Sequence, residues 1–143
     1  ARAASLGMSV HETVTLASII EGETGVDRER PFVSQVFHRR LKLGWPLEAN
    51  PTIQYALGTR RRVLVEDLGI DSPYNTYRHP GLPPGPIASP GEKSLRAALY
   101  PADTGYLYFV ADGRGGNIFS VTLSEHNRAV RLYKRQRKQA SMQ

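Results

Sequence analysis

The stretch LASIIEGETG, residues 16–25, combines the features that decide the fold of this chain with its first candidate functional residues. Upstream of it, Ser9 and Glu12 form an S-x-x-E capping box, a pattern that satisfies the free N–H groups at the start of a helix. Gly25 can adopt the left-handed conformation that closes a helix. We therefore expect a helix that begins near Ser9 and ends within this stretch.

Glu21 is predicted to lie on the apolar side of this helix. At about 100° per residue, the positions in line with it are Val10, Val14 and Ala17. The positions expected on the solvated side are His11, Thr15 and Ser18. Buried carboxylates are rare unless they are paired or functional, because desolvation disfavours the charged form. The pattern therefore makes Glu21 a candidate catalytic acid.

Glu23 points about 160° away from Glu21, so the two carboxylates cannot form an acid–base pair within the helix. Leu16, Ile19 and Ile20 flank Glu23, so we expect it to be partly buried against a partner from elsewhere in the chain. An alternative is that both glutamates are ordinary carboxylates at a frayed helix end that pair with arginines of the next segment.

Length and composition indicate one globular domain. The chain has 143 residues, of which 40% are hydrophobic and 22% charged, enough for a hydrophobic core. It has no cysteine, which excludes disulfides and thiolate chemistry, and no apolar run of membrane-spanning length. The net charge of +6 implies attraction to anionic partners. Its basic clusters, Arg60–Arg62 and residues 134–138, lack interleaved aromatic side chains, so we do not expect nucleic-acid binding.

The rest of the chain predicts an α+β fold, in which several short helices pack around a small antiparallel sheet with a C-terminal hairpin. Further helices are expected between Pro31 and Gly44, from Asn50 as N-cap to Gly58, from the Ser89–Glu92 capping box to Pro101, and from Thr122 into a basic tail at about 134–143. The hairpin is expected to pair residues 106–111, buried on both faces, with 118–122 across a glycine-rich turn.

Residues 72–90 form a proline-rich loop that contains two tyrosines and an asparagine in the sequence Tyr74-Asn75-Thr76-Tyr77. Its apolar side chains favour an ordered segment. Tyrosine rings can stack on sugars and amides can bond hydroxyls, so the loop suits the wall of a carbohydrate groove. A structural loop that covers the core is an equally good interpretation.

These residues together favour cleavage of a glycosidic bond. The four histidines show no metal-binding spacing, and no nucleophile elbow is present, so we expect no metal and no cofactor. A buried glutamate with a raised pKa can protonate a leaving oxygen. Most glycosidases also need a second carboxylate, for which Glu23, Glu48 and Asp67 are candidates. A single acid suffices only if the sugar supplies its own nucleophile.

Seven segments, in order along the chain, resemble one known family. They are Ala17-Ser18-Ile19-Ile20-Glu21-x-Glu23-Thr24, Val36-Phe37-x-x-Arg40-Leu41, Asn50-Pro51-Thr52-Ile53-x-Tyr55, Tyr74-Asn75-Thr76-Tyr77, Gly81-Leu82-Pro83-Pro84-Gly85-Pro86-Ile87, residues 106–110 and His126-Asn127. This set resembles the catalytic domain of the membrane-anchored endolytic murein transglycosylases, the YceG-like family. The resemblance implies cleavage of peptidoglycan glycan strands between N-acetylmuramic acid and N-acetylglucosamine, leaving a 1,6-anhydromuramic end.

The resemblance also implies roles for individual residues. It places the catalytic glutamate on Glu21, which would protonate the glycosidic oxygen and then take a proton from the muramic C6 hydroxyl. The substrate-binding residues that we predict are Glu23, Asn50, Gln54, Tyr74, Asn75 and Tyr77. The sequence departs from the family pattern at Asn50, where aspartate is usual, at Asn117, where a basic residue or histidine is common, and at Gly22, where lysine is frequent.

The family implies a location on the outer face of the bacterial cytoplasmic membrane, through an N-terminal membrane helix that is not part of this sequence, and a small LysM-like region. We therefore expect an excised catalytic domain whose partners are peptidoglycan strands and cell-wall synthesis enzymes. Two alternatives stay open: a muramidase-type hydrolase that uses water and a second carboxylate, and a non-catalytic module that binds the cell wall through its positive charge.

Overall fold

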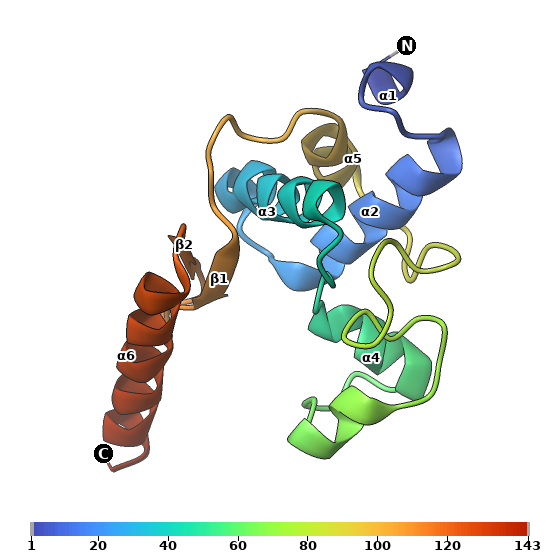
Figure 1. Ribbon diagram of the computed structural model, residues 1–143. Coiled ribbons are helices and arrows are strands. Elements are labelled where there is room, and N and C mark those ends of the chain that lie inside the picture. Colours follow the sequence, from blue (N-terminus) through green and yellow to red (C-terminus); the bar gives the residue numbers. More distant parts are fainter. Residues whose placement is uncertain (1, 143) are drawn as a thin grey trace.

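Helix α2, residues Val10–Glu23, lies at the centre of the helical part of the molecule and packs against α3, α4 and α5 (Figure 1). The computed structural model describes residues 2–142. The other helices within that range are α1 (Arg2–Ser5), α3 (Arg30–Leu43), α4 (Asn50–Leu57), α5 (Glu92–Leu99) and α6 (Leu123–Met142). The strands are β1 (Tyr108–Ala111) and β2 (Asn117–Ser120), and short 3-10 turns span Asp27–Glu29 and Val65–Gly69. The predicted α+β class is confirmed.

The start of α2 is as the sequence predicts. The Ser9 hydroxyl accepts from the Glu12 backbone N–H at 3.0 Å, and Glu12 Oε1 accepts from the Ser9 N–H at 2.9 Å. The helix ends at Glu23, and Thr24 caps it in an extended conformation. Both glutamates of the stretch 16–25 therefore lie in the last turn, where neighbouring segments can reach them.

The predicted apolar side of α2 is confirmed at Ala17, which is fully buried, and is wrong at three other positions. Val10 is 77% exposed, whereas Thr15 and Ser18 are buried. Their hydroxyls donate to the helix backbone, Thr15 to the carbonyl of His11 and Ser18 to that of Thr15, so burial leaves these groups satisfied. The buried face is centred on Leu16, Ile19 and Ile20, which meet Val33, Phe37, Leu47, Ala49 and Ala98 in the main core.

Two of the next three helices, α4 and α5, differ from the sequence expectation at their starts. α4 has Ala49, not Asn50, as its N-cap, because the Asn50 side chain bonds Tyr77 instead of the helix backbone. α5 has Gly91 as its N-cap, and the predicted Ser89–Glu92 capping box does not form. Gly44 and Gly58 end α3 and α4 in the left-handed conformation, as expected.

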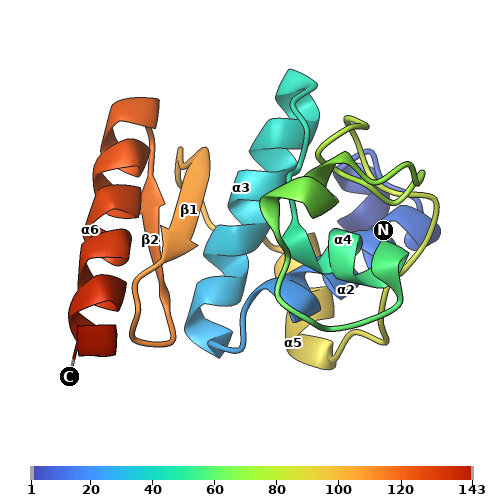
Figure 2. The ribbon, with the colours of Figure 1, turned by 90° about the horizontal axis from the view of Figure 1, so that it is seen from below.

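The predicted hairpin is confirmed, with Tyr108 opposite Ser120 and Ala111 opposite Asn117. It lies between α3 and α6 (Figure 2), and its strands are only half-buried instead of buried on both faces. Thr122 and Glu125 cap α6 as predicted. The predicted basic tail continues this helix to Met142; Gln143 and the side chain of Lys138 lie outside what the structure describes.

Residues 72–90 form the predicted irregular loop, anchored by Asn75. The Asn75 side chain is fully buried. Its amide nitrogen donates to the carbonyls of Leu68 at 3.0 Å and Ile70 at 2.8 Å, and its oxygen accepts from the Tyr77 N–H at 2.9 Å. The loop is thus fastened to the body of the molecule, and it places Tyr77 beside the end of α2.

Candidate active site

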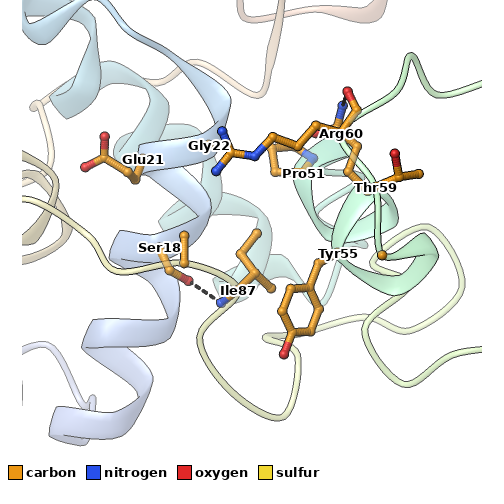
Figure 3. A pocket seen from close by; sticks show the side chains of 11 residues that line it. Ser18, Glu21, Gly22, Pro51, Tyr55, Thr59, Arg60 and Ile87 are labelled. Atoms are coloured by element: carbon orange, nitrogen blue, oxygen red, sulfur yellow. Dashed lines mark hydrogen bonds between the residues drawn. The ribbon is translucent and has the colours of Figure 1, made fainter.

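Two pockets flank the C-terminal turn of α2, and each contains one of the two glutamates. The Glu21 pocket has a volume of about 610 Å³ and lies between α2, α4 and the segment at Ile87 (Figure 3). The Glu23 pocket has a volume of about 430 Å³ and lies between α2, α3, the hairpin and α6. The chain therefore separates two carboxylates that are only two residues apart.

Three groups of the protein bind the Glu21 carboxylate and give it a structural role. Its Oε1 accepts from the Gly91 N–H at 2.8 Å and from the Ser94 hydroxyl at 3.1 Å, and its Oε2 lies 3.7 Å from Arg30 Nη1. The hydrogen bond from Gly91, with further help from Ser94 and Arg30, holds the pKa of Glu21 below its usual range. An ionised Glu21 therefore stabilises the N-terminus of α5.

The environment of Glu23 shifts its pKa in the direction opposite to that of Glu21. Its Oε2 is buried and has no hydrogen-bond partner among the described residues. Burial raises the pKa of Glu23 to about 7, although the nearby Arg40 cation acts in the other direction. A carboxyl group with this pKa exists in both protonation states near neutral pH, as a general acid–base catalyst requires.

Arg40 is a fixed cation in the Glu23 pocket. Its guanidinium donates to the backbone carbonyls of Leu107 at 2.9 Å and Leu47 at 3.1 Å, and its Nη1 lies 3.9 Å from Glu48 Oε2. Because the donors are used on the backbone, the side chain is held in place and is only 11% exposed. The position of the positive charge is therefore set before any ligand binds.

Asn50 and Tyr77 form a hydrogen-bonded pair in the same pocket. The Tyr77 hydroxyl donates to Asn50 Oδ1 at 2.6 Å. Burial, together with the negative charges of Glu23 and Glu48, raises the pKa of Tyr77 to about 12. Tyr77 therefore stays protonated, and the Asn50 amide nitrogen is left to meet a ligand.

The hairpin and α6 complete the Glu23 pocket with Asn117 and His126. His126 stacks on Tyr108 with ring centroids 5.0 Å apart, and its Nδ1 is buried without a hydrogen-bond partner among the described residues. Burial, aided by Arg40, lowers the pKa of His126, so its ring is neutral at pH 7. Asn117 is fixed by two hydrogen bonds to the Glu29 carboxylate, at 2.9 and 3.2 Å.

Glu48 is held in a strained backbone conformation at the edge of this pocket. Its φ of 52° is positive, the one such value for a non-glycine residue within the described range. Left-handed backbone costs about 1–2 kcal/mol for a side chain with a Cβ. Strain of this kind is often retained where a side chain is needed for function.

We expect Glu48→Gly to raise the free energy of unfolding by about 0.5–1 kcal/mol, because glycine accepts this φ without strain. Denaturant unfolding at neutral pH measures the change. Glu48→Gln is the matched control: it removes the charge, keeps the Cβ and should show no gain. A Glu48→Gly protein that is less stable than the glutamine variant would contradict the assignment of strain.

The structure separates the residues predicted to bind substrate. Glu23, Asn50 and Tyr77 line the Glu23 pocket, whereas Gln54 lines the Glu21 pocket, where its amide donates to the carbonyls of Arg60 and Arg61. Tyr74 packs against Tyr55, with ring centroids 4.8 Å apart. Asn75, with its amide fully buried and bonded within the fold, exposes no atom to a ligand.

From the sequence, Glu48 was predicted only as a possible second carboxylate and Asn117 only as a departure from the family pattern, and Arg40 and His126 were given no role in the site. Arg40 and His126 do occur in the segments quoted for the family resemblance, so a signal was present. Asn117 had no comparable signal, because its place in this pocket depends on how the hairpin packs on α3. Within residues 2–142, no cluster of three or more histidine, aspartate or glutamate side chains is arranged to hold a metal ion.

Known proteins match this chain over most of its length. The YceG-like family profile matches residues 1–132. The endolytic murein transglycosylase of Bacillus subtilis is 50% identical over 127 residues, which cover 88% of this chain and 35% of that protein. The enzyme of the same name from Streptococcus pneumoniae strain D39 is 36% identical over 133 residues, 88% of this chain and 24% of that protein.

A solved structure also resembles this chain. A YceG-like protein from Listeria monocytogenes superposes with a TM-score of 0.82 at 46% sequence identity, over 89% of this chain and 42% of that chain. The chain thus spans less than half of the length of each of these relatives. On the family profile and this likeness in sequence and structure, the chain belongs to the YceG-like family.

Proposed function

We propose that this chain is the catalytic part of a peptidoglycan lytic transglycosylase, with Glu23 as its acid–base residue. The observation that carries the proposal is the buried Oε2 of Glu23, which has no hydrogen-bond partner among the described residues and lies in a pocket of about 430 Å³. Burial raises the pKa of Glu23 to about 7, which suits this role. The relatives named endolytic murein transglycosylase supply the substrate class.

In the proposed reaction, protonated Glu23 donates its proton to the oxygen of the bond between N-acetylmuramic acid and N-acetylglucosamine. The bond from that oxygen to muramic C1 breaks. The carboxylate of Glu23 then takes the proton of the muramic C6 hydroxyl, and the C6 oxygen bonds to C1. No water enters, and Glu23 ends the cycle protonated. The intramolecular attack gains from proximity and needs no second carboxylate.

The fixed groups of the Glu23 pocket fit these steps. Arg40 stabilises the Glu23 carboxylate after it has given up its proton, because its charge favours the ionised form. The Asn50 amide, oriented by Tyr77, can bond a sugar hydroxyl or N-acetyl oxygen. Neutral His126 adds a flat polar surface that is stacked on Tyr108.

Glu23 fits the acid role better than Glu21, which the sequence resemblance favoured. Glu21 is held ionised by three partners and supports α5, so it has no proton to donate at neutral pH. The two residues occupy the same motif, and only their packing distinguishes them. We therefore propose that the general acid lies two residues further along the chain than predicted.

Glu48 gives the hydrolase alternative a candidate second carboxylate, because it lines the same pocket with its side chain half-exposed. The other candidate, Asp67, is paired with Arg61 at 2.8 Å and does not line the Glu23 pocket. The relatives' name favours transglycosylation over hydrolysis.

Mass analysis of products from purified glycan strands tests the reaction type. We expect new muramic ends that are lighter by one water than hydrolysed ends, with no oxygen incorporated from labelled water. Labelled oxygen at the new end would instead identify a hydrolase, with Glu48→Gln as the variant that should stop it. A protein that binds strands and leaves them intact would contradict both reactions.

We further propose that the enzyme acts outside the cytoplasmic membrane, where peptidoglycan is located. None of the helices described within residues 2–142 has the length and apolar character needed to cross a membrane.

A further inference from the structure

We propose that the Glu21 pocket binds the peptide substituent of a glycan strand, with Arg60 pairing a carboxylate of that peptide. The inference rests on the proposed function, because peptidoglycan carries short, carboxylate-bearing peptides on the lactyl group of its muramic sugars. It assigns a role to the larger of the two pockets beside the end of α2, which the proposed chemistry at Glu23 leaves unused.

The walls of the Glu21 pocket suit a peptide better than a sugar. Pro51, Tyr55 and Ile87 give it an apolar lining, and Tyr55 is 47% exposed while its ring packs against Tyr74. The Ser18 hydroxyl is already used, since it accepts from the Ile87 N–H and donates within α2. A sugar ring needs many hydrogen-bonding groups, whereas a peptide can place apolar side chains on such a surface and be fixed by a few polar contacts.

Arg60 is the cation among the residues that line this pocket. Figure 3 shows its side chain extending from beyond α4 toward the α2 side of the pocket. Its backbone carbonyl accepts from Gln54 Nε2, and within residues 2–142 no carboxylate forms an ion pair with its guanidinium. The Glu21 carboxylate is bound by Gly91, Ser94 and Arg30, so Arg60 is available for a carboxylate from outside.

The two pockets adjoin the same last turn of α2, one at Glu21 and the other at Glu23. A side-chain carbon on Gly22 would lie only 2.8 Å from the Cβ of Pro51, so α2 and α4 are in direct contact there. Gly22 and Pro51 line the Glu21 pocket, and their chain neighbours Glu23 and Asn50 line the Glu23 pocket. A peptide of about four residues spans up to ~13 Å. In the proposed binding mode, a peptide on the muramic sugar at Glu23 passes this contact and reaches Arg60.

The test compares two substrates and two variants of the protein. The substrates are glycan strands with their peptides intact and the same strands after an amidase has removed the peptides. Arg60→Gln removes the pocket's cation, and Arg62→Gln is the matched control, because it removes one charge from the same arginine cluster outside the pocket. Initial rates give KM and kcat for each pair, and thermal unfolding checks that both variants fold.

We expect Arg60→Gln to raise KM for peptide-bearing strands about tenfold, to leave kcat unchanged and to leave the cleavage of stripped strands unchanged. Arg62→Gln should match the wild type on both substrates. Equal effects of Arg60→Gln on both substrates, no effect, or the same effect from Arg62→Gln would overturn the inference alone. A wild-type protein that cleaves neither substrate would overturn the proposed function, and this inference with it.

Discussion

Glu23→Gln is expected to abolish cleavage of glycan strands and, at pH 8, to make the protein more stable than the wild type. General acid catalysis contributes about 10²–10⁴-fold to a rate, and glutamine cannot donate the proton. The stability gain arises because the wild type holds a carboxyl group where its charged form is disfavoured. A residue retained for its chemistry at the expense of stability would behave in this way.

The stability gain of Glu23→Gln should depend on pH, because the pKa of Glu23 is raised in the folded protein. Burial shifts the pKa of Glu23 from 4.5 to about 7, so the folded protein binds this proton more tightly than the unfolded chain does. Wild-type stability therefore falls as pH rises through this range and stays lower above it, by roughly 3 kcal/mol at the limit. Glu23→Gln lacks this loss. Denaturant unfolding at pH 4 and pH 8 should show a difference between the two proteins only at pH 8.

Glu21→Gln is the control for this effect, because the pKa of Glu21 is shifted the other way. Its ionised carboxylate accepts from Gly91 and Ser94, and the stability from these contacts is present at neutral pH and lost as pH falls. We expect the glutamine variant to lose about 1 kcal/mol at pH 8. Equal shifts of the same sign in both variants would contradict the two environments described here.

Asn75→Ala is expected to lower the free energy of unfolding by roughly 3 kcal/mol. The substitution leaves the carbonyls of Leu68 and Ile70 and the N–H of Tyr77 without their partner, and it opens a space in a fully buried position. Denaturant unfolding measures the loss, and Asn127→Ala, at an exposed asparagine, should change stability by less than about 0.5 kcal/mol. Lower turnover of Asn75→Ala with full stability would instead support the substrate contact that the sequence predicted.

Much of the fold could be predicted from local signals. These signals are the Ser9–Glu12 capping box, the helix-ending glycines at 44 and 58 and the glycine-rich hairpin turn. Each depends on contacts between residues close together in the sequence, so distant packing does not change it. The start of α5 was missed because its partner is not local. Gly91 donates to Glu21, which lies 70 residues away in the chain.

Contacts between distant parts of the chain also decide which of the two glutamates is the better candidate for the catalytic acid. Helical periodicity gives the direction of each side chain, and it separated Glu21 from Glu23 correctly. It could not show that Arg30 and Ser94 meet Glu21. Nor could it show that α3, the hairpin and α6 close over Glu23 and leave its Oε2 without a hydrogen-bond partner among the described residues. The pKa of each group depends on those tertiary contacts, so the candidate site could be narrowed to one motif and no further.

The most direct test of the central claim compares Glu21→Gln and Glu23→Gln side by side on purified glycan strands at pH 7. We expect Glu23→Gln to form no anhydromuramic ends above background. Glu21→Gln, once thermal unfolding confirms that it is folded, should retain most of the wild-type rate. The opposite result, with Glu23→Gln active and a folded Glu21→Gln inactive, would contradict the claim.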